Sequence, residues 1–336
     1  MDMLWEVLGF AAKGFVVFLT IAASAVVIAS LRRRRRMGGD HLEVKPLNER
    51  FEALGNALRV EVMDKKEFKA HLKELKKADK AAPAQKPSVF VLDFQGDILA
   101  TATKSLREEI TAITAMAKSD DEVVLRLESP GGGVPHYGLA AAQLTRLKDK
   151  KVKLTVCIDR VAASGGYMMA CVADQIVAAP FSIIGSIGVV AQVPNLNRLL
   201  KKHDVDFQEM TAGEFKRTVS VLGEITEKGR AKFQEQLEET HALFKDWVKS
   251  QRPKLDVQAV ATGEYWLGKR AVELGLVDKL YTSDDYLLEK AKTANVFKVT
   301  FEPHSGWRER LSRGAAEAAD RTVLTLLSRL MQLELR

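Results

Sequence analysis

The sequence contains only two cysteines, Cys157 and Cys171, and each lies within an apolar segment. Neither belongs to a CxxC pair or a histidine-rich cluster, so no cysteine-based zinc site can be recognised. Two cysteines in a chain of 336 residues also do not make a disulfide framework. We therefore expect two core thiols, with a single disulfide as the alternative, and we expect neither a metal site nor a cofactor.

Beyond residue 86 the sequence carries almost no net charge. Residues 1–86 contain 17 Lys and Arg against 11 Asp and Glu, which is about +6 of the total of +7. The basic character therefore belongs to the amino-terminal segment and not to the remainder of the chain. We expect no nucleic-acid partner.

Residues 14–31, GFVVFLTIAASAVVIASL, form an uncharged run that is about 27 Å long as a helix, nearly the thickness of a bilayer's hydrocarbon layer. A cleaved signal peptide and a buried core helix are the alternatives. A signal peptide would begin with positive charge, but here Asp2 and Glu6 come first and Arg32–Arg36 follow. Residues 1–36 are thus predicted to be an uncleaved transmembrane anchor in contact with lipid, with a polybasic flank that indicates the cytoplasmic side.

Two segments flank the predicted folded domain, which covers residues 88–285. Residues 37–87 are charged, carry apolar residues at helical spacing and end in AAPAQKP, which predicts a helical stalk and linker. This stalk would bind lipid headgroups or a partner chain, or serve as a solvated spacer. Residues 286–336 form a carboxy-terminal extension whose last part predicts an amphipathic helix, suited to a membrane surface or to packing on its own domain or on a partner.

Strand and helix patterns alternate in residues 88–285. Apolar, β-branched runs predict strands at 89–94, 122–128, 153–159 and 175–180, and amphipathic patterns predict helices at 105–118, 137–149, 164–174 and 227–249. This alternation indicates an α/β fold with a mostly parallel sheet and helices on both faces. In such folds reactive groups gather where strands end and helices begin.

Two strand-to-helix junctions are rich in small residues. SPGGGV, residues 129–134, lacks the Lys-Ser/Thr of a P-loop and the spacing of GxGxxG, and its glycine amides suit an oxyanion hole or simply a tight turn. AASGGY, residues 162–167, puts Ser164 at a turn before a helix, as a nucleophile or an N-cap. Together the junctions offer a nucleophile and amide donors, the minimal geometry for acyl transfer.

A serine nucleophile needs a base, and the six histidines offer few candidates. Only His136, after the glycine turn, and His203, with Asp204 or Asp206 nearby, are plausible. A lysine can serve instead when burial keeps its amine neutral. Composition alone does not choose a base among the many lysines.

Four motifs in order, SPGGGV, AASGGY, IGSIGVV and TAGEFK, resemble the signal peptide peptidase A family of serine peptidases (peptidase family S49), most closely its short branch, the SohB proteases. The resemblance implies that Ser164 is the nucleophile and Lys216 the general base. It also implies that Gly132 supplies the oxyanion-hole amide and that Ser186 holds the lysine amine, although Ser186 also suits an ordinary Gly-Ser turn. One departure is Glu128, where many relatives carry Asn.

The same resemblance implies a ClpP/crotonase-like fold, a repeated β-β-α superhelix, in a ring-like homo-oligomer where neighbouring subunits can contribute the serine and the lysine. It implies an endopeptidase of the inner membrane, acting on unfolded peptides or membrane-released fragments. Relatives hold the catalytic domain outside that membrane, whereas the arginine block indicates the cytoplasm. A crotonase-like acyl-CoA enzyme and a non-enzymatic membrane scaffold are the alternatives, while an α/β-hydrolase would need glycine at the position of Ala162.

Overall fold

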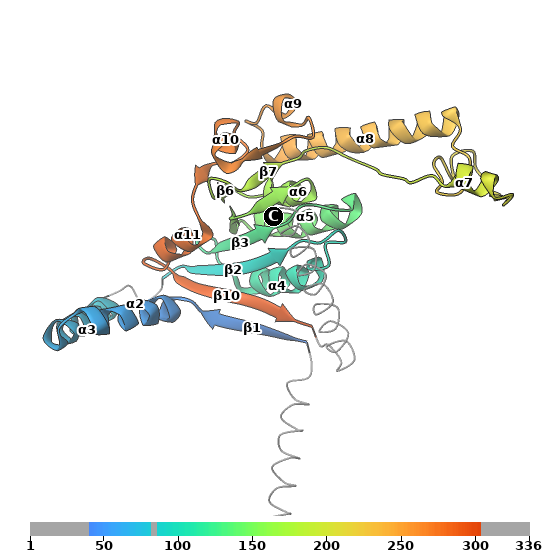
Figure 1. Ribbon diagram of the computed structural model, residues 1–336. Coiled ribbons are helices and arrows are strands. Elements are labelled where there is room, and N and C mark those ends of the chain that lie inside the picture. Colours follow the sequence, from blue (N-terminus) through green and yellow to red (C-terminus); the bar gives the residue numbers. More distant parts are fainter. Residues whose placement is uncertain (1–39, 82–85, 304–336) are drawn as a thin grey trace, which may run out of the picture. The chain divides into compact units, whose positions relative to one another are not determined.

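The computed structural model describes residues 40–81 and 86–303 (Figure 1). The predicted anchor, residues 1–36, and the predicted amphipathic tail beyond residue 303 lie outside this range. Within the described residues, no helix is both long enough and apolar enough to cross a membrane. Residues 43–300 form one compact unit.

A seven-stranded sheet forms the centre of the protein, in the order β1-β10-β2-β3-β4-β6-β9. All neighbours from β10 to β9 pair in parallel, so the predicted mostly parallel sheet is confirmed. The strands are β1 (His41–Pro46), β2 (Ser88–Gln95), β3 (Glu122–Glu128), β4 (Lys153–Ile158), β6 (Gln175–Ala178), β9 (Lys279–Leu280) and β10 (Asn295–Glu302). Apolar runs explain β2, β3 and β4, because strands buried on both faces read as continuous hydrophobic stretches.

Both faces of this sheet are covered. Leu125 and Leu127 of β3 belong to the larger apolar cluster, which packs against α4 (Thr103–Met116), α5 (Val134–Asp149) and α6 (Gly165–Ala170). Val124, the residue before Leu125, belongs to a smaller cluster with Tyr286 and Leu287 of α11 (Ser283–Lys290). Successive side chains of a strand point to opposite faces, so a single apolar run supplies both clusters.

A second, three-stranded sheet consists of β5 (Val161–Ala163), β7 (Ile183–Gly185) and β8 (Tyr265–Leu267). β5 and β7 are parallel, whereas β7 and β8 are antiparallel, so the fold as a whole is mixed. A single bridge between Ser129 and Ala162 joins this sheet to the end of β3. The small sheet was not predicted, because strands of three residues give no periodic signal.

Four further helices follow β7 in the chain: α7 (Asn197–Lys202), α8 (Glu227–Gln251), α9 (Val257–Val260) and α10 (Gly268–Glu273). Thr226 caps α8 by accepting a hydrogen bond from the amide of Gly229. Near the other end of α8, Trp247 donates a hydrogen bond of 3.0 Å to the carbonyl of Met168 in α6. The predicted helix at 227–249 is confirmed, and its carboxy-terminal part is fastened to α6.

The segment before residue 87 contains β1 and two helices, α2 (Asn48–Val62) and α3 (Lys65–Ala81). Leu47 is buried, and its amide donates to the carbonyl of Val296 in β10. The Asn48 side chain donates to the carbonyls of Ala291 and Ala294 and accepts from the amide of Val296. This part of the predicted stalk is therefore attached to the edge of the main sheet.

Candidate active site

Ser164 occupies a strained turn between β5 and α6. Its backbone has φ 51° and ψ −118°, a conformation that non-glycine residues rarely adopt and that costs about 1–3 kcal/mol. The amide of Ser164 donates to the carbonyl of Gly185, and its carbonyl accepts from the amide of Met168. Its side chain makes no capping hydrogen bond to α6. Ser164 thus occupies the N-cap position of α6, as one interpretation predicted, but its hydroxyl does not cap the helix.

The glycines on either side of this site are required by close packing. A Cβ at Gly166 would lie 2.6 Å from the carbonyl oxygen of Ser129, and one at Gly165 would overlap the ring of Tyr137. At Gly131, which has φ +93°, a Cβ would lie 2.7 Å from the Cβ of Ser164. Residues with side chains would force these segments apart. The two glycine-rich junctions recognised in the sequence thus lie directly against one another.

The three amides of the glycine turn have different partners. Gly131 donates to Ser129 Oγ at 3.1 Å, and Gly133 donates to the carbonyl of Ile98 at 2.9 Å. Between them, the amide of Gly132 has no acceptor among the described residues. A preorganised amide beside a serine hydroxyl is the donor that an oxyanion needs. Gly132 is also the glycine that the family resemblance indicates for this role.

Ser186 lies beside the Ser164 turn, because β5 and β7 are parallel and pair Ala163 with Gly185. The next residue on each strand is a serine with positive φ, 51° for Ser164 and 50° for Ser186. The amide of Ser186 donates to the carbonyl of Glu264 at 2.7 Å, which holds this second turn. The parallel pairing thus brings these two predicted site residues to the same edge of the small sheet.

Lys216 does not lie beside Ser164 within one chain. It is exposed, in the segment between α7 and the amino-terminal end of α8, where the ring of its neighbour Phe215 lies under the amines of Lys228 and Lys232. Helix α8 reaches the β7 turn at His241, nine residues beyond Lys232 and about 14 Å along the helix at 1.5 Å per residue, and it contacts α6 at Trp247, further on. Figure 1 shows this segment projecting with α7, while α6 lies against the main sheet.

No hydrogen bond links the histidines of the described residues to Ser164. His203 ends α7 and is exposed, on the same projecting segment as Lys216. His136 lies in the first turn of α5, and its ring is next to Gly133. His241, in the middle of α8, is half-buried, and its Nε2 lies 3.2 Å from the carbonyl oxygen of Ile187. Sequence reasoning missed this position because α8 crosses the β7 turn only in the folded protein.

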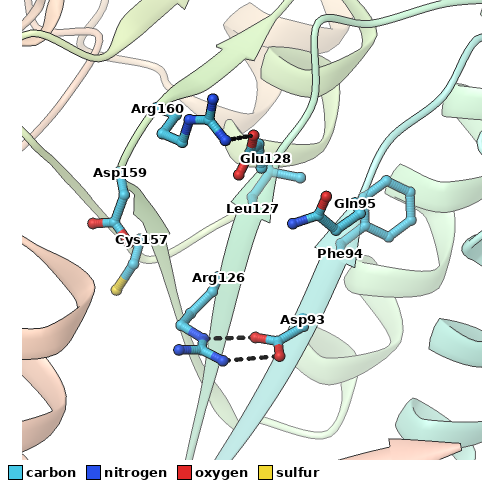
Figure 2. Close-up of a pocket in the computed structure, with 9 residues that line it drawn as sticks. All are labelled: Asp93, Phe94, Gln95, Arg126, Leu127, Glu128, Cys157, Asp159 and Arg160. Carbon is cyan, nitrogen blue, oxygen red and sulfur yellow. Dashed lines mark hydrogen bonds and ion pairs between the residues drawn. The ribbon is translucent and has the colours of Figure 1, made fainter. Parts of the chain in front are cut away.

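A charged pocket of about 300 Å³ lies at the carboxyl ends of β2, β3 and β4, and Ser164 is not among its lining residues (Figure 2). Arg126 forms two hydrogen bonds with Asp93, of 2.6 and 2.8 Å. Arg160 forms an ion pair with Glu128 at 2.9 Å. Glu128, the departure from the family pattern, is thus engaged in this pocket. Asp159, the third carboxylate that lines the pocket, accepts hydrogen bonds from the amide and the hydroxyl of Ser283. Each charged side chain of the pocket is therefore already engaged.

Both cysteines are free and buried, as predicted. Burial raises the pKa of the Cys157 thiol, and it raises that of Cys171 to about 12. Neither thiol is therefore a nucleophile near neutral pH. Among residues 40–81 and 86–303, no group of three or more His, Cys, Asp or Glu side chains is arranged to hold a metal ion.

Comparison with known proteins agrees with the resemblance seen in the motifs. The profile "Peptidase family S49 N-terminal" matches residues 2–144, and "Peptidase family S49" matches residues 146–297. A "Probable protease SohB" of Haemophilus influenzae is 52% identical over 318 residues, 90% of each chain. A second, of Buchnera aphidicola subsp. Schlechtendalia chinensis, is 44% identical over 305 residues, 86% of this chain and 100% of the relative.

Among solved structures, a mutant of the 1510-N membrane-bound stomatin-specific protease in complex with a substrate peptide has a TM-score of 0.42 and 14% identity, covering 69% of this chain and 99% of that one. The family assignment depends on the sequence relatives, which match over most of the chain. On this evidence the chain belongs to peptidase family S49 and is a protease of the SohB type.

Proposed function

We propose that this protease is a serine endopeptidase that uses Ser164 as nucleophile and Lys216 as general base. The observation that carries the proposal is the position of Ser164, on a strained turn whose hydroxyl does not cap α6. Beside it lies a glycine turn with one amide, that of Gly132, left without an acceptor among the described residues. A strained, uncommitted serine next to an uncommitted amide is an arrangement for acyl transfer.

The chemistry follows two balanced steps. The neutral amine of Lys216 accepts the hydroxyl proton of Ser164 while Oγ attacks the carbonyl carbon of the peptide bond, and the amide of Gly132 donates to the resulting oxyanion. The ammonium then returns its proton to the leaving amine, which gives an acyl-enzyme. Water hydrolyses this ester by the same route, again with the lysine as base.

The lysine of one copy would serve the serine of a neighbouring copy. In a single chain Lys216 is exposed and separated from α6 along α8, so a second chain is needed to complete the dyad. The segment that carries Lys216 exposes many large apolar side chains, as expected of a surface that a partner covers. They are Val190, Val193, Leu196, Leu199, Val205, Phe207, Met210, Phe215 and Val221. Head-to-tail contacts of this kind close into rings, and Ser186 would then hold the incoming amine.

An anchor at residues 14–31 would hold this assembly at the inner membrane. Substrates would be unfolded peptides or fragments released from the membrane, because an exposed strand-end site accepts an extended chain. The catalytic domain would lie on the side opposite to the amino terminus. The arginine block favours the cytoplasm for that side, as in the positive-inside rule.

A fluorophosphonate label followed by mass spectrometry tests the proposal. We expect one adduct, on Ser164, in the full-length assembled protein, and no adduct in Ser164→Ala, which should also stop the cleavage of fluorescein-casein. Ser250→Ala is the matched control and should cleave normally, because Ser250 is an exposed serine on α8 whose hydroxyl bonds only the carbonyl of Trp247 and the side chain of Gln251. Casein cleavage that persists in Ser164→Ala would disprove the assignment of the nucleophile.

A further inference from the structure

A chain of buried hydrogen bonds runs beneath the glycine turn. The amide of Gly131 donates to Ser129 Oγ at 3.1 Å, Ser129 Oγ lies 2.6 Å from Tyr137 Oη, and Tyr137 donates to the carbonyl of Asp97 at 2.8 Å. Because the single phenolic proton goes to Asp97, the Ser129 hydroxyl must donate to Tyr137. Both side chains are 0% exposed. All three bonds therefore run in one direction; the first two are buried, and the third ends at the carbonyl of Asp97, in an exposed loop.

The same two residues contact every segment of the candidate site near Ser164. The Tyr137 ring packs against Gly165, the residue after the nucleophile, and Ser129 packs against Gly166. A Cβ at Gly96, where β2 leads into the loop that contains Ile98, would overlap both hydroxyls. The nucleophile turn, the glycine turn and the 96–98 loop thus share one buried support.

This support determines which amide of the glycine turn is free. Ser129 takes the amide of Gly131, and Ile98, in the loop fastened by Tyr137, takes the amide of Gly133. Gly132 lies between these two fixed points, so its amide cannot rotate independently. A donor held before the reaction stabilises an oxyanion without reorganising during it.

We propose that Tyr137 is a positioning residue that acts through Ser129 to hold the Gly132 amide in place for the oxyanion. This inference rests on the proposed function. Tyr137 does not touch substrate, and its effect reaches the reaction through two hydrogen bonds. Burial also raises the pKa of Tyr137, which keeps the phenol protonated and donating near neutral pH.

The test is Tyr137→Phe, which removes one oxygen atom and leaves the ring against Gly165. We expect kcat for fluorogenic peptide cleavage to fall roughly 10- to 100-fold, with KM within about twofold, because a misplaced donor weakens the transition state and not the ground state. Tyr286→Phe is the matched control. It removes a buried hydroxyl that bonds Glu122 at 2.6 Å, on the other face of the main sheet, and should leave kcat unchanged.

A double-mutant cycle with Ser129→Ala separates positioning from general stability. If both residues act through one chain of bonds, Tyr137→Phe with Ser129→Ala loses no more kcat than the worse single variant, whereas independent effects would multiply. Melting curves of all variants report the folded fraction, and kcat is expressed per folded molecule.

The outcomes are distinct. An unchanged kcat in Tyr137→Phe, a multiplicative double variant, or an equal loss in Tyr286→Phe refutes the role of Tyr137. Ser164→Ala, measured alongside, tests the proposed function separately. Full cleavage by Ser164→Ala would refute both the proposed function and this inference. No cleavage by Ser164→Ala, together with an unchanged kcat in Tyr137→Phe, would refute the inference alone.

Discussion

Two inactive variants should restore each other if Lys216 of one copy serves Ser164 of the next. Within one chain the contacts of Phe215 hold this lysine near Lys232 of α8, about 14 Å along the helix from His241, where α8 contacts the β7 turn. A proton passes directly only across a hydrogen bond of about 3 Å. We therefore expect Ser164→Ala and Lys216→Ala to be inactive alone and active when coexpressed.

The size of the recovery follows from random assembly. In an equal mixture, about half of the sites have an intact serine and, independently, about half face a neighbour with an intact lysine, so about a quarter of sites work. Wild type coexpressed with the double variant should also keep about a quarter. If both residues came from the same chain, the mixture of the two single variants would have no active sites. The mixture of wild type and double variant would keep about half.

Fluorescein-casein turnover per subunit measures these fractions, and mass spectrometry of affinity-tagged subunits verifies the equal mixing ratio. A fluorophosphonate adduct should form only on the serine of Lys216→Ala subunits. No activity in the first mixture, with about half in the second, would refute the reasoning and require Lys216 to fold back toward its own Ser164.

Three further predictions concern other parts of the described protein. Gly131→Ala adds a Cβ 2.7 Å from the Cβ of Ser164, on a backbone with φ +93°. It should lower the free energy of unfolding by about 2 kcal/mol and remove most of the activity. Gly138→Ala is the control: its new Cβ would meet no atom within 4 Å, so it should raise the melting temperature and leave turnover unchanged. Glu122→Gln should cost about 2 kcal/mol in urea unfolding at neutral pH, because a lysine amine lies 2.6 Å from this buried carboxylate. Burial alone would raise the pKa of Glu122, but hydrogen bonds from that lysine, a threonine and a tyrosine hold it below 4.5. The carboxylate therefore stabilises the fold above pH 4.5, and this contribution disappears as the pH falls through the lowered pKa. In acid, the unfolding free energies of Glu122→Gln and of the unmodified protein should become equal. Cys157 and Cys171 should resist iodoacetamide at pH 8 in the native protein and react fully in guanidinium, and modification of the native protein would contradict their burial.

The strands of the main sheet that were predicted well share one physical cause. Residues 122–128 form an apolar run bounded by polar residues, and β3 covers the same residues, because burial on both faces demands such a run. β1 (His41–Pro46) was missed because its side chains are almost all exposed and it lies beside β10, about 250 residues away in the chain. Its position depends on contacts that no local pattern records.

Some features of the candidate site could likewise be predicted from the sequence, and others depend on contacts between distant segments. The sequence placed the two glycine turns after consecutive strands of one sheet, but the turn with Ser164 follows β5 of the small sheet, and a bridge between Ser129 and Ala162 brings it to the end of β3. The free amide of Gly132 was indicated by resemblance alone, and only the bonds of its two neighbours explain it. His241 and Tyr137 were not assigned roles near the site, because their partners Ile187 and Asp97 are 54 and 40 residues away.

The sequence by itself determined the α/β class, the strand-end location of Ser164 and, through four ordered motifs, the family. These depend on apolar periodicity and on glycines, which are local properties of the chain. Only the tertiary structure decided which backbone amide is left uncommitted, which buried side chains hold it, and that Lys216 is remote from Ser164 in its own chain. Such features arise from contacts between segments far apart in sequence, where packing and hydrogen-bond geometry determine the outcome.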